Sequence, residues 1–174
     1  MGLITGAVAA YLVGCVPAAR FASRMAGERP WAKVAGPLAD FAKGYLALLL
    51  FAPTPSLGIA LAFTALVAGA QWPVSGESGR HGQWAMLGAI SQVSPVTVPA
   101  WGLLWGIGFV ASGYFVVGRA VATALLPLVL GLVAGGPIGW IALPGCVMVI
   151  ERSREALKAV RAGTEAKHHW NSPR

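Results

Sequence analysis

The sequence predicts an all-α, polytopic integral membrane protein, and three observations lead to that prediction. Of the 174 residues, 56% are hydrophobic and only 11% are charged, whereas soluble domains carry about 25% charged residues. The mean hydropathy is +0.68. The charges also cluster in sequence and leave long uncharged stretches, as expected where apolar segments lie in lipid and their backbone polar groups must bond within helices.

Seven apolar runs, separated by breaks rich in Pro and Gly, each predict one transmembrane helix. Several runs are shorter than the ~20 residues that a straight span needs. The fourth is the shortest, so a re-entrant segment is the alternative there. The expected spans are residues 2–21, 38–52, 56–72, 84–94, 97–116, 120–135 and 137–150.

A further helix is expected after the seventh run. In the stretch ERSREALKAVRAGTE, Arg154, Lys158 and Arg161 recur at helical spacing, while Leu157 marks another face. Gly163 is a typical helix stop. The segment therefore predicts either a continuation of the seventh span or a basic helix at the membrane interface.

The positions of the charged residues favour seven crossings. With seven, every Asp, Glu, Lys and Arg lies on one side, because the connections near 52–56, 94–97 and 135–137 carry no charge. With six, the basic tail would lie opposite the first basic loop, against the positive-inside tendency. We expect about seven transmembrane helices, an outside N-terminus, a cytoplasmic C-terminus, one membrane domain over residues 1–165 and a disordered tail over 166–174.

The composition excludes several classes of protein. The formal net charge is +7, but the basic segments lie between apolar runs, so membrane lipids or a phosphorylated substrate are expected partners and nucleic acid is not. Cys15 and Cys146 lie inside apolar runs and predict neither a disulfide framework nor a metal set. Adjacent His168 and His169 lack further ligands at usable spacing. No metal and no cofactor is therefore expected.

A Gly-rich basic loop over residues 72–83, WPVSGESGRHGQ, separates the third and fourth runs. Gly79 and Gly82 would let backbone N–H groups approach a phosphate, and Arg80 offers a planar bidentate donor next to His81. A simple turn is the alternative reading of the same glycines.

Other bases are expected on the same cytoplasmic face. Lys43 lies three residues after Asp40, so the two share a helical face, and they are expected at the cytoplasmic end of the second span. Arg119 precedes the sixth span and Arg154 follows the seventh. Few carboxylates neutralise these bases, which predicts a site for a phosphorylated ligand; the alternative is that the bases only fix topology.

In order and spacing, these segments resemble the bacterial acyl-phosphate:glycerol-3-phosphate acyltransferases, the PlsY type, over nearly the whole chain. The resemblance implies a seven-span fold in the bacterial plasma membrane. It also implies transfer of a fatty acyl group from acyl phosphate to the 1-hydroxyl of glycerol 3-phosphate, which gives lysophosphatidic acid for phospholipid synthesis. The matching stretches are AYLVGCVPAAR, ADFAKGYLAL, GAQWPV, VVGRAVATALLPL and REALKAVRAGTE.

The resemblance also implies roles for individual residues. Asp40 would orient Lys43, and the site would face the cytoplasm. The residues implied to contact substrate phosphate are Lys43, Gly79, Arg80, His81, Gly82, Arg119 and Arg154.

The chain departs from the family pattern at several polar positions. The family's first signature, Gly-Ser-Gly-Asn-Ile-Gly-Ala-Thr-Asn, is absent, and Ala70, Ser153 and Ala156 stand where the family has His, His and Asn. Losing one hydrogen-bonding partner can cost ~2.7 to 4 kcal/mol of barrier. Two classes therefore stay open: an acyltransferase, or a catalytically degenerate paralogue that binds a lipid or phosphorylated ligand. A transporter would show repeated halves with interrupted helices, which the chain lacks.

Overall fold

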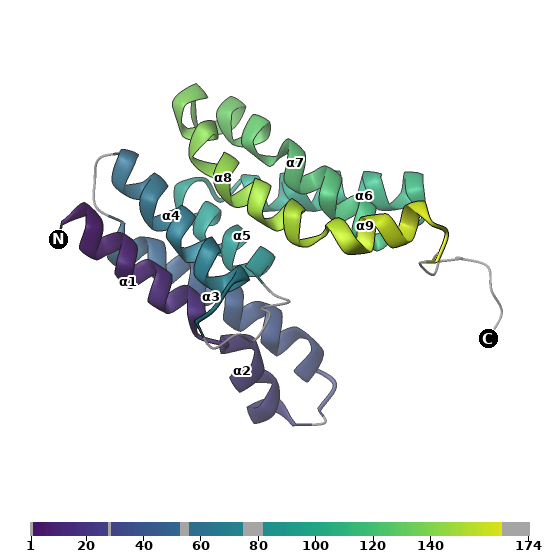
Figure 1. Cartoon of the computed structure of the whole chain (residues 1–174), viewed down its shortest axis with the longest axis horizontal. Coiled ribbons are helices and arrows are strands. Elements are labelled where there is room, and N and C mark those ends of the chain that lie inside the picture. The colour runs from purple at the N-terminus through teal and green to yellow at the C-terminus, as the bar shows by residue number, and fades with distance from the viewer. Residues whose placement is uncertain (1, 28, 53–55, 75–81, 165–174) are drawn as a thin grey trace.

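The computed structural model is a bundle of helices, with the start of α1 and the end of α9 at opposite ends (Figure 1). It describes residues 2–27, 29–52, 56–74 and 82–164, and within them all regular secondary structure is helical. The all-α prediction is thereby confirmed. The helices are α1 (Leu3–Cys15), α2 (Ala18–Ala26), α3 (Ala32–Phe51), α4 (Ser56–Gln71), α5 (Gly82–Val93), α6 (Thr97–Ser112), α7 (Phe115–Ala134), α8 (Gly136–Arg152) and α9 (Arg154–Arg161).

The seven predicted runs all correspond to helical structure. The first corresponds to α1 and α2 together, and the others to α3 through α8. The tail helix is found as α9, separated from α8 at Ser153, and Gly163 follows it with a φ of 70°. The predicted tail over 166–174 lies outside the described residues.

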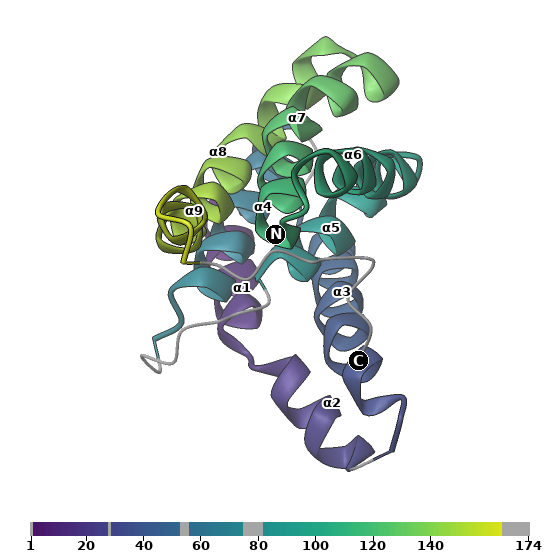
Figure 2. The same cartoon turned by 90° about the vertical axis from the view of Figure 1, so that its right-hand side faces the viewer.

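The expectation of one continuous helix over residues 2–21 was wrong, because the helix breaks at Pro17. Proline has no N–H to donate to the Val13 carbonyl. That carbonyl accepts from the Val16 N–H instead, at 3.1 Å, and the Ala18 N–H donates to the Val16 carbonyl at 2.9 Å. Figure 2 shows α2 and the first turns of α3 projecting together from the remaining helices.

The second span begins earlier than predicted. Helix α3 starts at Ala32 and continues through Pro37, so Lys43 is the twelfth of its 20 residues. The expectation that Asp40 and Lys43 lie at the end of this helix was therefore wrong. Pro37 lies near the start of the helix, so most backbone bonds of α3 stay intact.

Helix α5 is short because other helices surround it. Its 12 residues extend about 18 Å, less than the ~30 Å hydrocarbon core of a bilayer. Met86, Leu87 and Ile90 are almost completely buried, and α5 contacts α3, α4, α6 and α8. It is therefore the central helix of the bundle and faces protein rather than lipid.

Within the described part of the chain, three segments are long and apolar enough to cross a membrane by length and composition: Leu3–Ala26, Lys33–Phe51 and Phe115–Ala134. Shorter apolar helices cover Leu57–Gln71 and Thr97–Ser112. The Asp40 and Lys43 pair therefore lies inside a candidate span, where ionised groups are rare and usually functional.

Glycine allows α3 and α5 to approach closely. A Cβ added at Gly44 would meet the carbonyl of Ala85, and one added at Gly88 would meet the carbonyl of Phe41. Small residues at such contacts are typical of helix packing in membranes. Gly44, which follows Lys43 in the stretch ADFAKGYLAL, thus allows α3 to pack on α5.

Candidate anion-binding site

The ammonium group of Lys43 lies among three oxygen atoms. Its Nζ donates to the Gly14 carbonyl at 3.2 Å and to the Val16 carbonyl at 2.9 Å, and it lies 3.1 Å from Oδ1 of Asp40. The side chains of Lys43 and Asp40 are 9% and 5% exposed. Two of the three donors of an ammonium are therefore used in hydrogen bonds to carbonyls. The Asp40 carboxylate supplies the counter-charge, and its Oδ1 makes no hydrogen bond among the described residues. The phosphate contact predicted for Lys43 stays a prediction.

Of the Gly-rich loop, only one end is described. Gly79, Arg80 and His81 lie outside the described residues. Gly82 is buried and begins α5, and a Cβ added there would lie 2.5 Å from Nε2 of Gln71, the last residue of α4. The two helices that flank residues 75–81 therefore meet at this contact.

We expect Gly82→Ala to fold with a near-wild-type melting temperature. The nearest atoms that its Cβ would meet, Nε2, Cδ and Cγ, all belong to the flexible Gln71 side chain. A side chain can change rotamer, whereas backbone cannot. Thermal unfolding of the purified protein in detergent measures this. A melting temperature as low as that of a variant with a backbone clash, such as Gly88→Ala, would contradict it.

Arg119 lies near the start of α7 and reaches the junction of α8 and α9. Its Nη2 donates to Oγ of Ser153 at 3.1 Å, and that hydroxyl donates to the Val149 carbonyl at 2.9 Å. The Nε of Arg119 is buried and has no acceptor among the described residues. A buried donor without a partner is costly, so this position favours an acceptor from outside the chain.

No carboxylate of the described residues forms an ion pair with Arg119. The nearby acids on α8 and α9 are both engaged, because Glu151 pairs with Arg154 at 2.9 Å and Glu155 pairs with Lys158 at 2.8 Å. The hydrogen bond from Lys158 lowers the pKa of Glu155 below its usual value, which keeps that pair ionised. Within the described ranges, the half-buried Arg119 charge thus has no counter-charge, and an anion would stabilise it.

Aromatic packing holds the start of α7 in place. The ring of Trp105 stacks on Phe109 at 5.6 Å and meets Phe115 edge-on at 5.0 Å between centroids. A Cβ added at Gly118 would lie 2.6 Å from the Trp105 carbonyl oxygen. This close contact fixes the first turn of α7, and with it the position of Arg119.

Arg154 follows Ser153 in the chain, but its guanidinium lies in the surface pair with Glu151, where the two side chains are 65% and 52% exposed. Such exposed pairs contribute little to stability. Each of the three described bases has its own polar partners: Lys43 bonds to the Gly14 and Val16 carbonyls, Arg119 to Ser153, and Arg154 to Glu151. Their convergence on one phosphate site stays a prediction.

In the sequence, Ser153 stands where the family has a histidine. The structure shows it 5% exposed and bonded to Arg119, so this position keeps a polar function. Of the other two departures, Ala70 is buried where α1 and α4 meet, its backbone N 3.1 Å from a Cβ added at Gly14. Ala156 is half-buried on α9.

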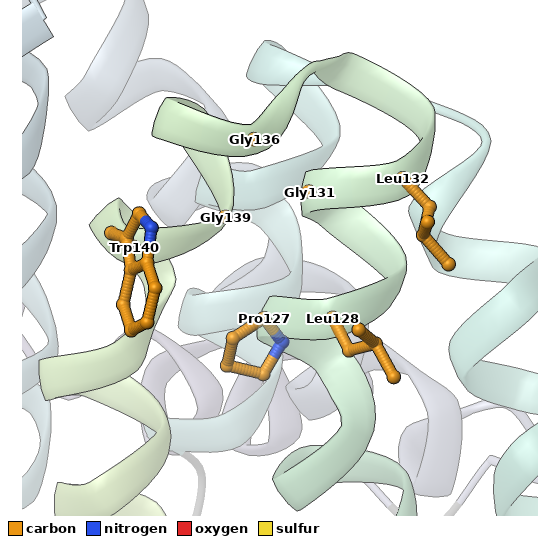
Figure 3. Close-up of a pocket in the computed structure, with 7 residues that line it drawn as sticks. All are labelled: Pro127, Leu128, Gly131, Leu132, Gly136, Gly139 and Trp140. Carbon is orange, nitrogen blue, oxygen red and sulfur yellow. The ribbon is translucent and has the colours of Figure 1, made fainter.

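A pocket of about 430 Å³ lies between α7 and α8, at the end of this helix pair away from Arg119 (Figure 3). It offers no charged side chain, and Figure 3 shows Trp140 and Leu132 at its two sides. It therefore does not suit a phosphate group. Its lining residues are Pro127, Leu128, Gly131, Leu132, Gly136, Gly139 and Trp140.

Comparison with known proteins identifies the family. A family model described as glycerol-3-phosphate acyltransferase matches residues 27–163. Two crystal structures of PlsY (YgiH), an integral membrane glycerol 3-phosphate acyltransferase, have a TM-score of 0.77 to this chain, with 95% of this chain and 94% of theirs covered. The lysophosphatidic acid form is 24% identical and the glycerol 3-phosphate form 23%.

The two kinds of match carry different conclusions. Among curated proteins no sequence matches, and at 23% and 24% identity the structural likeness shows a shared fold. The family model covers well over half of the chain. The chain therefore belongs to the glycerol-3-phosphate acyltransferase family.

Proposed function

We propose that this membrane acyltransferase takes its acyl group from acyl phosphate and works at the cytoplasmic face of the bacterial inner membrane. The 1-hydroxyl oxygen of glycerol 3-phosphate attacks the acyl carbonyl carbon and forms an ester bond. The bond from that carbon to the phosphate oxygen breaks, and phosphate leaves with the bonding electrons and the hydroxyl proton. The products are lysophosphatidic acid and inorganic phosphate.

The proposal rests on the charge and the contacts of Arg119. Both substrates and both products bear phosphate. Arg119 presents a half-buried charge, and in the part of the chain that the structure describes its Nε has no acceptor and no carboxylate contacts it. Arginine suits phosphate because its planar guanidinium donates two parallel hydrogen bonds. Glycines and Arg80 of the 72–83 loop would complete the phosphate contacts, and Arg154 would add charge near Ser153.

The chemistry demands little more than charge and placement. Acyl phosphate is already activated, so no covalent intermediate on the protein is needed. Holding the hydroxyl against the carbonyl converts a bimolecular step into an effectively unimolecular one. Cations on the phosphate stabilise the negative charge of the leaving group as it forms. Residues such as Arg119 supply this second contribution.

The orientation is supported by the charge distribution. The bases of α2, of the start of α7 and of α9 lie apart in the sequence from the uncharged connections near 52–56 and 135–137. Figure 1 shows the start of α4 near the start of α1, and α9 at the other end of the bundle. Basic connections favour the cytoplasmic side. The N-terminus is accordingly assigned to the outside.

We expect purified protein in lipid nanodiscs to form lysophosphatidic acid from palmitoyl phosphate and radiolabelled glycerol 3-phosphate. Palmitoyl-coenzyme A, offered as the alternative donor, is expected to give no product, because its thioester carries no phosphate at the acyl carbon for the cationic site to bind. Thin-layer chromatography of the label measures the product. Product from the thioester alone would overturn the donor assignment, and glycerol 3-phosphate binding without any product would identify a catalytically degenerate paralogue.

A further inference from the structure

Lys43 supplies hydrogen bonds that the break between α1 and α2 removes. In an unbroken helix the Gly14 carbonyl would accept from the Ala18 N–H, four residues on. Here the Ala18 N–H donates to Val16, and helix ends leave such carbonyls without partners. The ammonium of Lys43 donates to both Gly14 and Val16. Its positive charge also suits the negative end of the α1 dipole.

Asp40 completes this arrangement. A lysine charge inside a candidate span is expensive unless a counter-charge accompanies it. Asp40, one turn earlier on α3 and 4% exposed, lies 3.1 Å from the ammonium. We use the name Lys43 brace for Lys43, Asp40 and the two carbonyls that Lys43 joins.

The brace joins the end of α1 to α3, and these two helices pack on α4 and α5, which flank residues 75–81. On one side, the end of α1 is fastened to the end of α4, because Tyr11 donates to the Trp72 carbonyl at 3.2 Å. A Cβ added at Gly14 would also lie 3.1 Å from the Cα of Gly69 in α4. On the other side, Gly44 packs against Ala85 near the start of α5.

We propose that Lys43 is a positioning residue, which fixes the broken end of α1 against α3 and so sets the spacing between α4 and α5 where the 75–81 segment joins them. Its buried ammonium is held by the two carbonyls and by the Asp40 carboxylate, so we expect it to make no contact with substrate phosphate. This inference rests on the proposed function for its link to acyl transfer, but the brace itself can be tested without activity.

The sharpest test is a double-mutant cycle between Lys43 and Pro17. Pro17→Ala restores a backbone N–H and lets α1 continue into α2, so the Gly14 carbonyl regains a partner that does not depend on Lys43. We expect Lys43→Met alone to lower the melting temperature by roughly 6 °C or more, because a buried pair loses one member. In the Pro17→Ala background the same change should have a clearly smaller effect.

Catalysis provides the second measurement of the cycle, at a temperature where every variant is folded. Lys43→Met should lower kcat by about tenfold or more, since small displacements of a site are costly, and this loss should differ between the two backgrounds. Lys43→Arg, which can still donate to both carbonyls and Asp40, should recover part of the melting temperature and of kcat. Lys33→Met, an exposed lysine on the same helix, is the matched control and should change neither.

Each of the following results supports or contradicts the Lys43 brace. Failure of Lys43→Met to fold, with Lys43→Arg and Lys33→Met folding, supports the brace. A higher KM for glycerol 3-phosphate in Lys43→Met, with unchanged melting temperature and no dependence on Pro17, overturns it and makes Lys43 a phosphate contact. If the wild-type protein transfers no acyl group, the proposed function fails, whereas the melting temperatures still test the brace.

Discussion

Gly44→Ala is expected to prevent folding of most of the protein. The added Cβ would meet the carbonyl of Ala85, which is backbone of the central helix and cannot rotate away. Helices α3 and α5 would have to separate along their whole contact, with a loss of about 3 kcal/mol or more. The measurement is the yield of monodisperse protein in size-exclusion chromatography, followed by its melting temperature.

Gly106→Ala is the matched control for this substitution. Gly106 lies within α6, and a Cβ added there would meet nothing within 4 Å. Alanine also has the better intrinsic helix propensity. We expect wild-type yield and melting temperature for Gly106→Ala. Equal behaviour of the two variants would show that the close α3–α5 contact does not decide stability.

Arg119→Met is expected to lower kcat/KM for acyl transfer by about 10² to 10³. The change removes the uncompensated charge that would bind phosphate and stabilise the leaving group. It also removes a buried donor without a partner, so the protein should fold as well as wild type. Initial rates over a range of glycerol 3-phosphate and acyl phosphate concentrations, with melting temperatures measured alongside, check both statements.

Ser153→Ala serves as the control for Arg119→Met. It removes the hydroxyl that accepts from Nη2 of Arg119 but keeps the charge. We expect a smaller loss of kcat/KM, of about tenfold, because the guanidinium loses orientation and not its attraction for phosphate. A greater loss in Ser153→Ala than in Arg119→Met would mean that the hydroxyl, and not the arginine, acts on the substrates.

Hydropathy was sufficient to predict most of the architecture. The apolar runs with Pro and Gly breaks correspond to α3 through α8, and the basic helix with its Gly163 stop is found as α9. Such patterns are local and do not depend on the rest of the fold. Two span bounds were wrong: the first predicted span is broken at Pro17, and the second begins before Pro37 and continues through it. In this chain the Pro17 break is stabilised by a distant lysine, which sequence spacing does not reveal.

The site was less predictable because its contacts are long-range. The approach of Asp40 to Lys43 follows from their spacing within one helix. The contacts of Lys43 with the carbonyls of α1 join residues 27 and 29 positions apart, and the one between Arg119 and Ser153 spans 34 positions. Ser153 gave one signal in sequence, as a small polar residue at the end of an apolar run. Its bond to the Val149 carbonyl is the usual one for serine in a helix.

The central claim is that Arg119 binds the phosphate of glycerol 3-phosphate, and titration calorimetry in lipid nanodiscs tests it most directly. We predict that glycerol 3-phosphate binds wild-type protein about tenfold to a hundredfold more tightly than Arg119→Met. Glycerol, which lacks the phosphate, should bind neither protein. Equal affinity of glycerol 3-phosphate for the two proteins would contradict the claim.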